Sequence, residues 1–327
     1  MLAPFHAGAL ERLRKNFAVT YENWMETKKL LSPAEFVKRI QEQNIEVLII
    51  EADFVMREVF EKISKLQFLG ICRADTNHVD IEAATEAGVI VVNTPARNDV
   101  AVAELAIGLM LSVLRGIPSA HNMVSSRSWT DPTAAYFSLR GFEITGKTIG
   151  IVGLGAIGKQ VAKRLKAFDC TILAYDPFVD EETMRSFGAR SAQLDELMNQ
   201  SDIITIHLPV NPDTLGIINA DRVAMMKHSA YLINTASTFV VDNEAIIKAL
   251  QEKRIAGAGF DVYETWPVQP DSPLLDLDNV VLTPHIGGAT YETIERYSNM
   301  VVDDAESFLK GERPKHIKNP QVLEKHG

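Results

Sequence analysis

The chain has 327 residues, of which 46% are hydrophobic and 23% are charged, and its formal net charge is −10. This length suits two globular domains, and the composition excludes a disordered or fibrous protein. The acidic balance argues against nucleic acids and membranes as partners, because either would require a basic face.

The chain has two cysteines, Cys72 and Cys170, and neither has Cys or His neighbours at metal-ligand spacing. We therefore expect no disulfide and no bound metal, and a reducing cytoplasmic location. Charged residues near the N-terminus precede any apolar run long enough for a signal peptide. The longest apolar stretch, residues 101–117, contains Glu104 and Arg115 and is too short to span a membrane.

Short β-rich runs alternate with helical patterns from residue 46 onward. Strands are predicted at residues 47–50, 66–71 and 89–92, and a long helix at residues 100–115. This alternation is typical of βαβ units around a parallel sheet. One further strand is expected near the N-terminus, at residues 17–20.

A second series of predicted strands begins at residue 148. Helical patterns separate most of them, as a doubly wound sheet requires. The amphipathic segment 292–310 has no strand after it, so we expect it to return to the first domain. The expected fold class is α/β, with two Rossmann-like doubly wound parallel-sheet domains and a cleft between them. The strands of this second series are predicted at residues 148–152, 171–175, 203–207, 231–234, 257–261 and 280–283.

A glycine-rich segment follows the strand 148–152 directly and opens the helical run 159–168. It reads Gly153-Leu154-Gly155-Ala156-Ile157-Gly158. In such a loop the first glycine allows a tight turn, the second lets the backbone approach a pyrophosphate, and the third lets helix and strand pack closely. The N–H groups and the dipole at the helix start then face the anion.

Asp176 lies 18 residues after Gly158, at the end of the next predicted strand. A carboxylate at this place accepts hydrogen bonds from both ribose hydroxyls, which is typical of NAD sites. It would repel a 2′-phosphate, and residues 177–179 include no Arg or Lys, so NAD is expected rather than NADP. The structural alternative is a glycine turn beside a surface aspartate.

Several further motifs carry a family resemblance. With them, the chain resembles the D-isomer-specific 2-hydroxyacid dehydrogenases over nearly its whole length. The motifs are Asn93-Thr94-Pro95 with Val102-Ala103-Glu104, Gly146-Lys147-Thr148, Tyr175-Asp176-Pro177, His207-Leu208-Pro209, Leu232-Ile233-Asn234-Thr235-Ala236, Gly259-Phe260-Asp261-Val262 and Thr283-Pro284-His285-Ile286-Gly287-Gly288.

The resemblance implies a discontinuous substrate domain of residues 1–97 plus 290–327, an NAD-binding domain of residues 98–289, and a homodimer. It also implies His285 as the general acid/base. The positions it places around the cofactor are Gly153, Gly155, Ala156, Ile157, Gly158, Asp176, His207, Leu208, Pro209, Thr214, Thr235, Ala236, Ser237, Asp261, His285 and Gly287.

The residues around His285 support a catalytic role independently. His285 follows a predicted strand and Pro284, and it precedes two glycines. Ligands of open α/β sheets bind at the carboxyl ends of strands, and imidazole titrates near neutral pH. The alternative is a structural histidine.

Three positions depart from the family pattern, and all concern the substrate. Ser237 stands where the family has an Arg that binds the substrate carboxylate, and Trp266 stands where it has a Glu that orients the His. Glu264 is the nearest candidate to replace that Glu. Asp75 lies in the loop that gives the family a glycine amide, where its charge would repel a substrate carboxylate unless Arg73 offsets it.

These observations favour an NAD-dependent oxidoreductase of CH–OH donors with an atypical substrate site. Its substrate would be a small hydroxy acid or sugar-acid-like molecule bound by Asp75, Thr76, Ser237 and Thr238, with Trp266 over an apolar face. Two alternatives stay open. One is a redox-neutral isomerase or lyase that uses bound NAD transiently, and the other is a non-catalytic NAD(H)-sensing protein.

Overall fold

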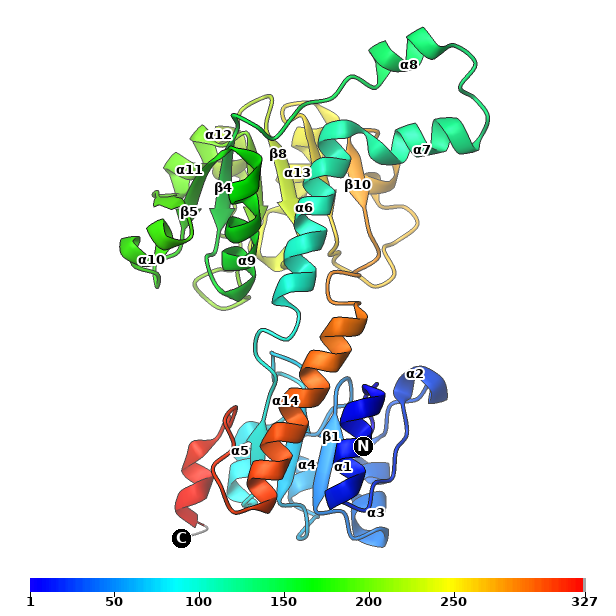
Figure 1. Ribbon diagram of the computed structural model, residues 1–327, viewed down its shortest axis with the longest axis vertical. Helices are drawn as coiled ribbons and strands as arrows, with labels where there is room; N and C mark the ends of the chain where they lie inside the picture. The colour runs from blue at the N-terminus through cyan, green and yellow to red at the C-terminus, as the bar shows by residue number, and fades with distance from the viewer. Residues whose placement is uncertain (326–327) are drawn as a thin grey trace. The chain divides into compact units, whose positions relative to one another are not determined.

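The computed structural model describes residues 1–325 and divides into two compact units. Unit 1 combines Met1–Arg97 with the residues from Thr290 onward, and unit 2 is Asn98–Ala289. Each unit is built on a parallel sheet with helices around it (Figure 1). The expected α/β fold with two Rossmann-like domains is confirmed.

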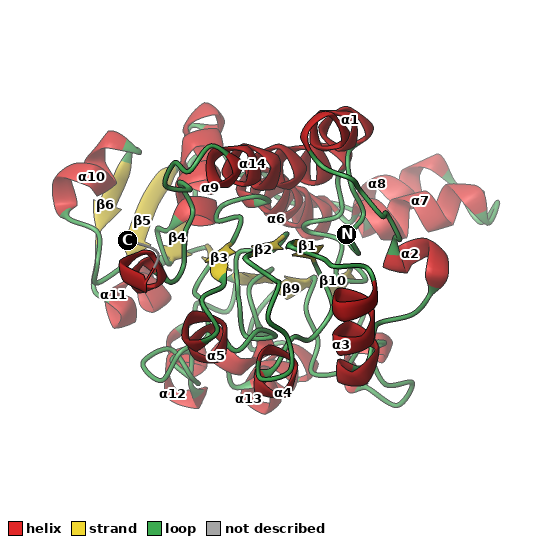
Figure 2. Ribbon diagram, turned by 90° about the horizontal axis from the view of Figure 1, so that it is seen from below, coloured by secondary structure: helices red, strands yellow, loops and turns green. Residues whose placement is uncertain are grey.

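Unit 1 contains a sheet of order β1-β2-β3, made of Val47–Ile50, Phe68–Ile71 and Ile90–Val92. These strands read as continuous apolar runs because both faces of the sheet are covered. Figure 2 shows α1 and α14 on one side and α3, α4 and α5 on the other. The helices of unit 1 are α1 (Ala7–Asn16), α2 (Trp24–Thr27), α3 (Pro33–Glu42), α4 (Arg57–Phe60), α5 (Ile81–Glu86) and α14 (Tyr291–Leu309), with a 3-10 turn η4 (Pro320–Lys325).

Helix α14 comes from the end of the chain and completes the core of unit 1. Its residues Tyr297 and Val301 are fully buried, and the Tyr297 hydroxyl donates to the Pro4 carbonyl at 2.7 Å. A Cβ atom on Gly70 of β2 would lie only 2.7 Å from Val301 Cγ1. Glycine at this position therefore allows the close approach of α14 to the sheet.

The strand expected at residues 17–20 is wrong. Phe17 instead ends α1, where its N–H donates to the Leu13 carbonyl at 3.0 Å. Leu2 takes the place beside β1, with its N–H donating to the Ile49 carbonyl at 2.8 Å. Phe17 and Val19 are apolar because their side chains pack against the core that includes α14, and not because this segment pairs with a strand.

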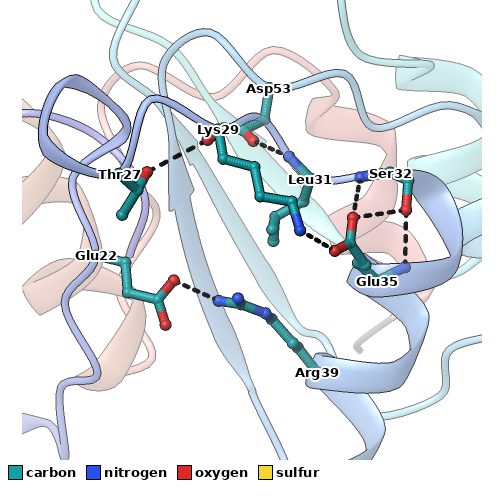
Figure 3. A network of polar contacts seen from close by, with 8 residues as sticks. All are labelled: Glu22, Thr27, Lys29, Leu31, Ser32, Glu35, Arg39 and Asp53. Atoms are coloured by element: carbon teal, nitrogen blue, oxygen red, sulfur yellow. Dashed lines mark hydrogen bonds and ion pairs between the residues drawn. The ribbon is translucent and has the colours of Figure 1, made fainter.

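A polar network fixes the loop after β1 to the start of α3 (Figure 3). Ser32 and Glu35 form a reciprocal capping box at the N-terminus of α3, and Lys29 forms an ion pair with Glu35. The Leu31 N–H donates to Asp53 Oδ1 at 3.0 Å. The loop that leaves the carboxyl end of β1 is thereby held in place.

Unit 2 contains a seven-stranded parallel sheet of order β6-β5-β4-β7-β8-β9-β10. The chain direction across the sheet reverses between β4 and β7, which makes this the topological switch point where such folds bind ligands. The strands are β4 (Thr148–Val152), β5 (Thr171–Tyr175), β6 (Ala189–Ser191), β7 (Ile203–Ile206), β8 (Tyr231–Asn234), β9 (Gly257–Phe260) and β10 (Val280–Leu282).

Six helices and three 3-10 turns belong to the body of unit 2. They are α6 (Asp99–Arg115), α9 (Ala156–Leu165), α10 (Glu181–Ser186), α11 (Leu194–Gln200), α12 (Ala220–Met225), α13 (Asn243–Gln251), η1 (Lys166–Phe168), η2 (Thr238–Val240) and η3 (Pro273–Asp276).

Two more helices, α7 (Ile117–Ser125) and α8 (Pro132–Ser138), form an arm that leaves the body of unit 2 (Figure 1). Neither helix buries any residue. The arm exposes large apolar side chains, including Val124, Tyr136 and Phe137. Among residues 1–325 no single helix is long and apolar enough to cross a membrane, although α6 and α7 together, bent by 66°, meet the length and composition criteria.

Candidate active site

The glycine loop lies between β4 and α9, at the switch point of unit 2. Gly153 has a φ of 94°, and a Cβ atom there would lie 2.8 Å from the His207 carbonyl oxygen. A Cβ atom on Gly158 would lie 2.1 Å from the Gly153 carbonyl oxygen. A Cβ atom on Gly155 would meet nothing within 4 Å, so the backbone at the start of α9 is open to a ligand.

Asp176 follows β5 and is tied to this loop. Its Oδ2 accepts from the Leu154 N–H at 2.8 Å, and its Oδ1 accepts from the Phe178 N–H at 2.9 Å. A carboxylate offers about four acceptor positions, so about two remain for ribose hydroxyls. The glycine loop and Asp176 together fit a dinucleotide with an unmodified adenosine ribose.

The Asp176 carboxylate yields the first prediction. We expect Asp176→Ser to weaken NAD binding by about tenfold to a hundredfold, since hydrogen bonds to a charged group contribute about 1.5–3 kcal/mol. The discrimination against NADP should shrink as well. Isothermal titration with both dinucleotides measures this. Asp180→Ser, which removes a carboxylate from the same segment while a serine hydroxyl keeps the N-cap of α10, is the control. An unchanged Kd for NAD in Asp176→Ser would show that the carboxylate faces no ligand.

His207 and Thr235 follow β7 and β8, the next strands along the sheet. The His207 ring is buried, with Nε2 at 2.9 Å from Thr205 Oγ1 and Nδ1 without a partner among the described residues. Thr235 Oγ1 is likewise buried and unpaired. Two orphaned polar atoms at adjacent strand ends indicate a place where a polar ligand supplies the missing bonds.

Thr214 closes the turn that follows His207. Its hydroxyl donates to the Pro209 carbonyl at 2.6 Å and accepts from the Asn211 N–H at 2.9 Å. Leu208 is buried, whereas Pro209 is exposed at the edge of the site. Thr214 thus shapes the turn through its own hydroxyl.

Burial lowers the pKa of His207 to about 3, so the folded protein holds this ring neutral. An unfolded imidazole has a pKa of about 6.5, so the unfolded chain binds the proton more readily as the pH falls. The contribution to the free energy of unfolding is complete above about pH 6.5 and falls toward pH 3, by up to about 1.4 kcal/mol per pH unit.

We therefore expect the unfolding free energies of the unaltered protein and His207→Asn to converge as the pH is lowered from about 7 to about 5. Urea titrations followed by circular dichroism measure both. His228→Asn, at an exposed position after α12, is the control. A constant difference for His207→Asn would mean that the ring is not held neutral.

Asp261, directly after β9, organises the turn that carries His285. Its Oδ1 accepts from Thr283 Oγ1 at 2.6 Å and from the Ile286 N–H at 2.9 Å, and its Oδ2 accepts from the Gly287 N–H at 2.8 Å. Three of about four acceptor positions are therefore used within the turn. Asp261 was expected to contact the cofactor. Its role in fixing the turn could not be seen in the sequence, because its hydrogen-bond partners lie 22 to 26 positions later in the chain.

His285 itself has a φ of 56°, in the left-handed region. That conformation costs a residue other than glycine about 1–2 kcal/mol and persists where the surroundings fix it. The Asp261 hydrogen bonds supply this restraint, because they fix residues on both sides of His285 in the chain. An exposed histidine is thus presented at the carboxyl end of β10.

Trp266 lies against this histidine. The centroids of the two rings are 4.0 Å apart with an interplanar angle of 65°, and Trp266 is 65% exposed. Its peptide bond to Pro267 is cis. An indole therefore covers the imidazole from the position where the resemblance places a carboxylate.

Ser237 and Glu264 are both engaged locally. Ser237 Oγ accepts from the Phe239 N–H at 3.2 Å at the start of η2, and its carbonyl accepts from Asn234 Nδ2 at 2.9 Å. The Ala236 N–H donates to Asn234 Oδ1 at 3.0 Å. Glu264 Oε1 accepts from Asn243 Nδ2 at 3.0 Å, which ties Glu264 to the start of α13.

Asp75 and Thr76 belong to unit 1, in the loop after β2. His78 and Arg73 lower the pKa of Asp75 to about 2, with Arg73 Nε at 3.2 Å from Asp75 Oδ2. The Thr76 carbonyl accepts from the Val79 N–H at 3.0 Å. His78, in the same loop, is buried, and its Nε2 has no partner among the described residues.

Three comparisons show what the chain is similar to. The family model for the NAD-binding domain of D-isomer specific 2-hydroxyacid dehydrogenases matches residues 107–287. A glyoxylate reductase of Thermofilum pendens is 41% identical over 89% of this chain and 86% of its own length. A D-3-phosphoglycerate dehydrogenase of Methanocaldococcus jannaschii is 37% identical over 88% of this chain, which spans only 54% of that protein. The D-lactate dehydrogenase structure from Escherichia coli has a TM-score of 0.80 and 28% identity, covering 95% of this chain and 96% of that one.

Proposed function

The chain belongs to the D-isomer-specific 2-hydroxyacid dehydrogenase family, and on that premise we propose that it moves a hydride between NAD and a small hydroxylated acid, with His285 as the general acid/base. The observation that carries this proposal is the presentation of His285 by the Asp261 hydrogen bonds at the carboxyl end of β10. The homologous proteins are NAD-dependent oxidoreductases of CH–OH donors, and the residues of unit 2 fit NAD.

Bound NAD supplies the hydride acceptor for oxidation and the hydride donor for reduction. The start of α9 would hold the pyrophosphate of NAD, and Asp176 would hold its adenosine ribose. His285 takes the hydroxyl proton of the substrate while the carbinol carbon loses its hydride and the C=O bond forms. In reduction His285 returns that proton to the oxygen, and Asp261 keeps the ring in place through the backbone.

The substrate we propose is rich in hydroxyl groups, such as a sugar acid. By the resemblance, Ser237 stands where the family has an Arg, and a single hydroxyl does not reproduce the two parallel hydrogen bonds that a guanidinium gives a carboxylate. Asp75 and Thr76 add acceptors for hydroxyl groups, and the exposed Trp266 ring offers an apolar face for a sugar-like carbon skeleton.

A substrate panel tests this proposal. The purified protein is incubated with NAD and hydroxy acids, sugar acids and polyols, and both NADH absorbance and substrate loss are followed. We expect NADH formation in step with the loss of one hydroxylated acid. Substrate loss without NADH would favour a redox-neutral reaction, and tight NAD binding with no turnover would favour an NAD(H)-sensing protein.

We further propose that the α7–α8 arm mediates a homodimer. Its helices bury nothing within the chain, while Tyr136 is 72% and Phe137 67% exposed. Contiguous exposed apolar residues of this kind mark interaction sites.

Replacing Tyr136 and Phe137 with Ser is therefore expected to halve the particle mass measured by light scattering. Replacement of Phe178 with Ser, at an exposed apolar position outside the arm, is the control and should leave the mass unchanged. An arm variant that keeps the mass of the unaltered protein would contradict the assignment.

A further inference from the structure

Unit 2 contains a pocket beside the segments that carry Ser237 and Trp266. It has a volume of about 350 Å³ and lies between the start of α13, the end of β9 and the segment 262–274. Small-molecule sites begin at about this size. None of the positions assigned above to NAD lines it, whereas Thr238, expected above to bond the substrate, and Glu264, the candidate to replace the family's Glu, both do.

The lining of this pocket combines an apolar floor with acidic walls. Ile246 and Phe260 are buried beneath it, and Val262 and Leu274 extend the apolar surface. Glu244, Glu264 and Asp271 stand around it, and its lining includes no Lys, Arg or His. The pocket therefore favours a ligand with an apolar body and a positive charge.

Thr238 gives an independent indication of a ligand. It lines the pocket and is only 7% exposed, and its side-chain hydroxyl makes no hydrogen bond to any described residue. The hydroxyl is not among the fully enclosed unpaired atoms of the described residues, so it opens onto the pocket and can bond to a bound molecule.

The hydrogen bonds of Asn243 indicate whether a bound molecule must donate or accept hydrogen bonds here. Its Nδ2 donates to the Thr238 carbonyl at 3.2 Å and to Glu264 Oε1 at 3.0 Å. Both amide hydrogens are thus engaged, and the groups left over at this wall are acceptors: Asn243 Oδ1 and the second carboxylate oxygen of Glu264. A ligand that satisfies them must donate hydrogen bonds.

We infer that this pocket is an accessory binding site for an organic cation, a primary amine carried on an apolar body. The ammonium group donates to Glu264, Asn243 and the Thr238 hydroxyl, while the apolar portion lies on Ile246 and Phe260. Because Thr238 directly follows Ser237 and the segment 262–274 includes Trp266, an occupant would also restrain the segments that hold both residues.

The experiment compares two probes of nearly equal size, 2-phenylethylamine and the neutral 2-phenylethanol, by isothermal titration of the full chain. We expect the amine to bind at least tenfold more tightly than the alcohol, with an affinity that falls as salt is added. Equal affinities, or no binding of the amine, would overturn the inference.

Variants locate the site. Glu264→Gln should weaken amine binding about tenfold, whereas Glu252→Gln, at the other end of α13, should leave it unchanged. Val268→Trp, which fills the pocket from its lining, should abolish amine binding while the Kd for NAD stays the same. Equal losses in Glu264→Gln and Glu252→Gln would show that the amine responds only to overall charge. An unchanged affinity in Val268→Trp would place it elsewhere.

Discussion

In a double variant Ser237→Arg, Trp266→Glu, we expect the reduction of glyoxylate with NADH to rise at least a hundredfold over the unaltered protein. The new guanidinium gives the substrate carboxylate two parallel charge-assisted hydrogen bonds. The new carboxylate replaces an indole whose ring centroid is 4.0 Å from that of His285, and so meets the imidazole directly. A hundredfold change corresponds to about 2.7 kcal/mol of transition-state stabilisation, which is within the range of such contacts.

Steady-state kinetics with glyoxylate and pyruvate measure this gain, and three variants interpret it. Ser237→Arg alone should lower KM for the keto acid, because it restores binding of the carboxylate. Ser237→Lys should give a smaller improvement, because an ammonium is a point charge without the planar fork. If the double variant binds NAD normally and remains inactive on both keto acids, the substrate pocket differs from the family at more than these two positions.

Substitution of His285 by Ala should lower turnover by about a hundredfold to ten-thousandfold on the substrate that gives the highest rate in the panel. The expected cause is loss of the group that exchanges a proton with the substrate oxygen. The backbone of the turn should persist, because Asp261 holds it through Ile286 and Gly287. The Kd for NAD should accordingly change by no more than about threefold, a difference below 1 kcal/mol.

Added imidazole distinguishes a chemical role from a structural one. We expect it to restore part of the lost turnover in His285→Ala, since a free imidazole fits the space left beside Trp266 and carries the same proton. His228→Ala should show neither loss nor response to imidazole, because that residue is exposed after α12. Full activity of His285→Ala would remove the acid/base assignment, and loss without any rescue would favour a structural role.

The strands were predictable where burial on both sides makes a continuous apolar run. The bounds of β1, β4, β5 and β8 agree with those expected from the sequence. The short strand β6 was missed because it lies at the edge of the sheet and exposes Arg190, so it carries no apolar run. The arm formed by α7 and α8 was also missed. Neither helix buries a residue within the chain, so the sequence shows no apolar face that packs on a core there.

In the candidate site, contacts between consecutive elements were predictable from the sequence, and contacts between distant segments were not. The glycine loop with Asp176 was predictable because its parts occupy consecutive elements, and the Leu154–Asp176 hydrogen bond follows from their adjacency. The contact between Trp266 and His285 was not predictable, because it depends on the path of the chain between β9 and β10. The acidic pocket likewise combines residues from η2, α13 and the segment 262–274, whose proximity no local pattern shows.

The position of α14 has a consequence for how the chain is made. A ribosome synthesises residues 98–289 after the sheet of unit 1 and before the helix that covers one face of it. At about 5–20 residues per second, synthesis of this segment takes roughly 10–40 s, and α14 does not exist until it is finished. Throughout this interval Ile49 and Phe68, fully buried in the finished protein beside Tyr297 and Val301, have only α1 to cover them. Until α14 is synthesised, the core of unit 1 therefore remains incomplete on that face.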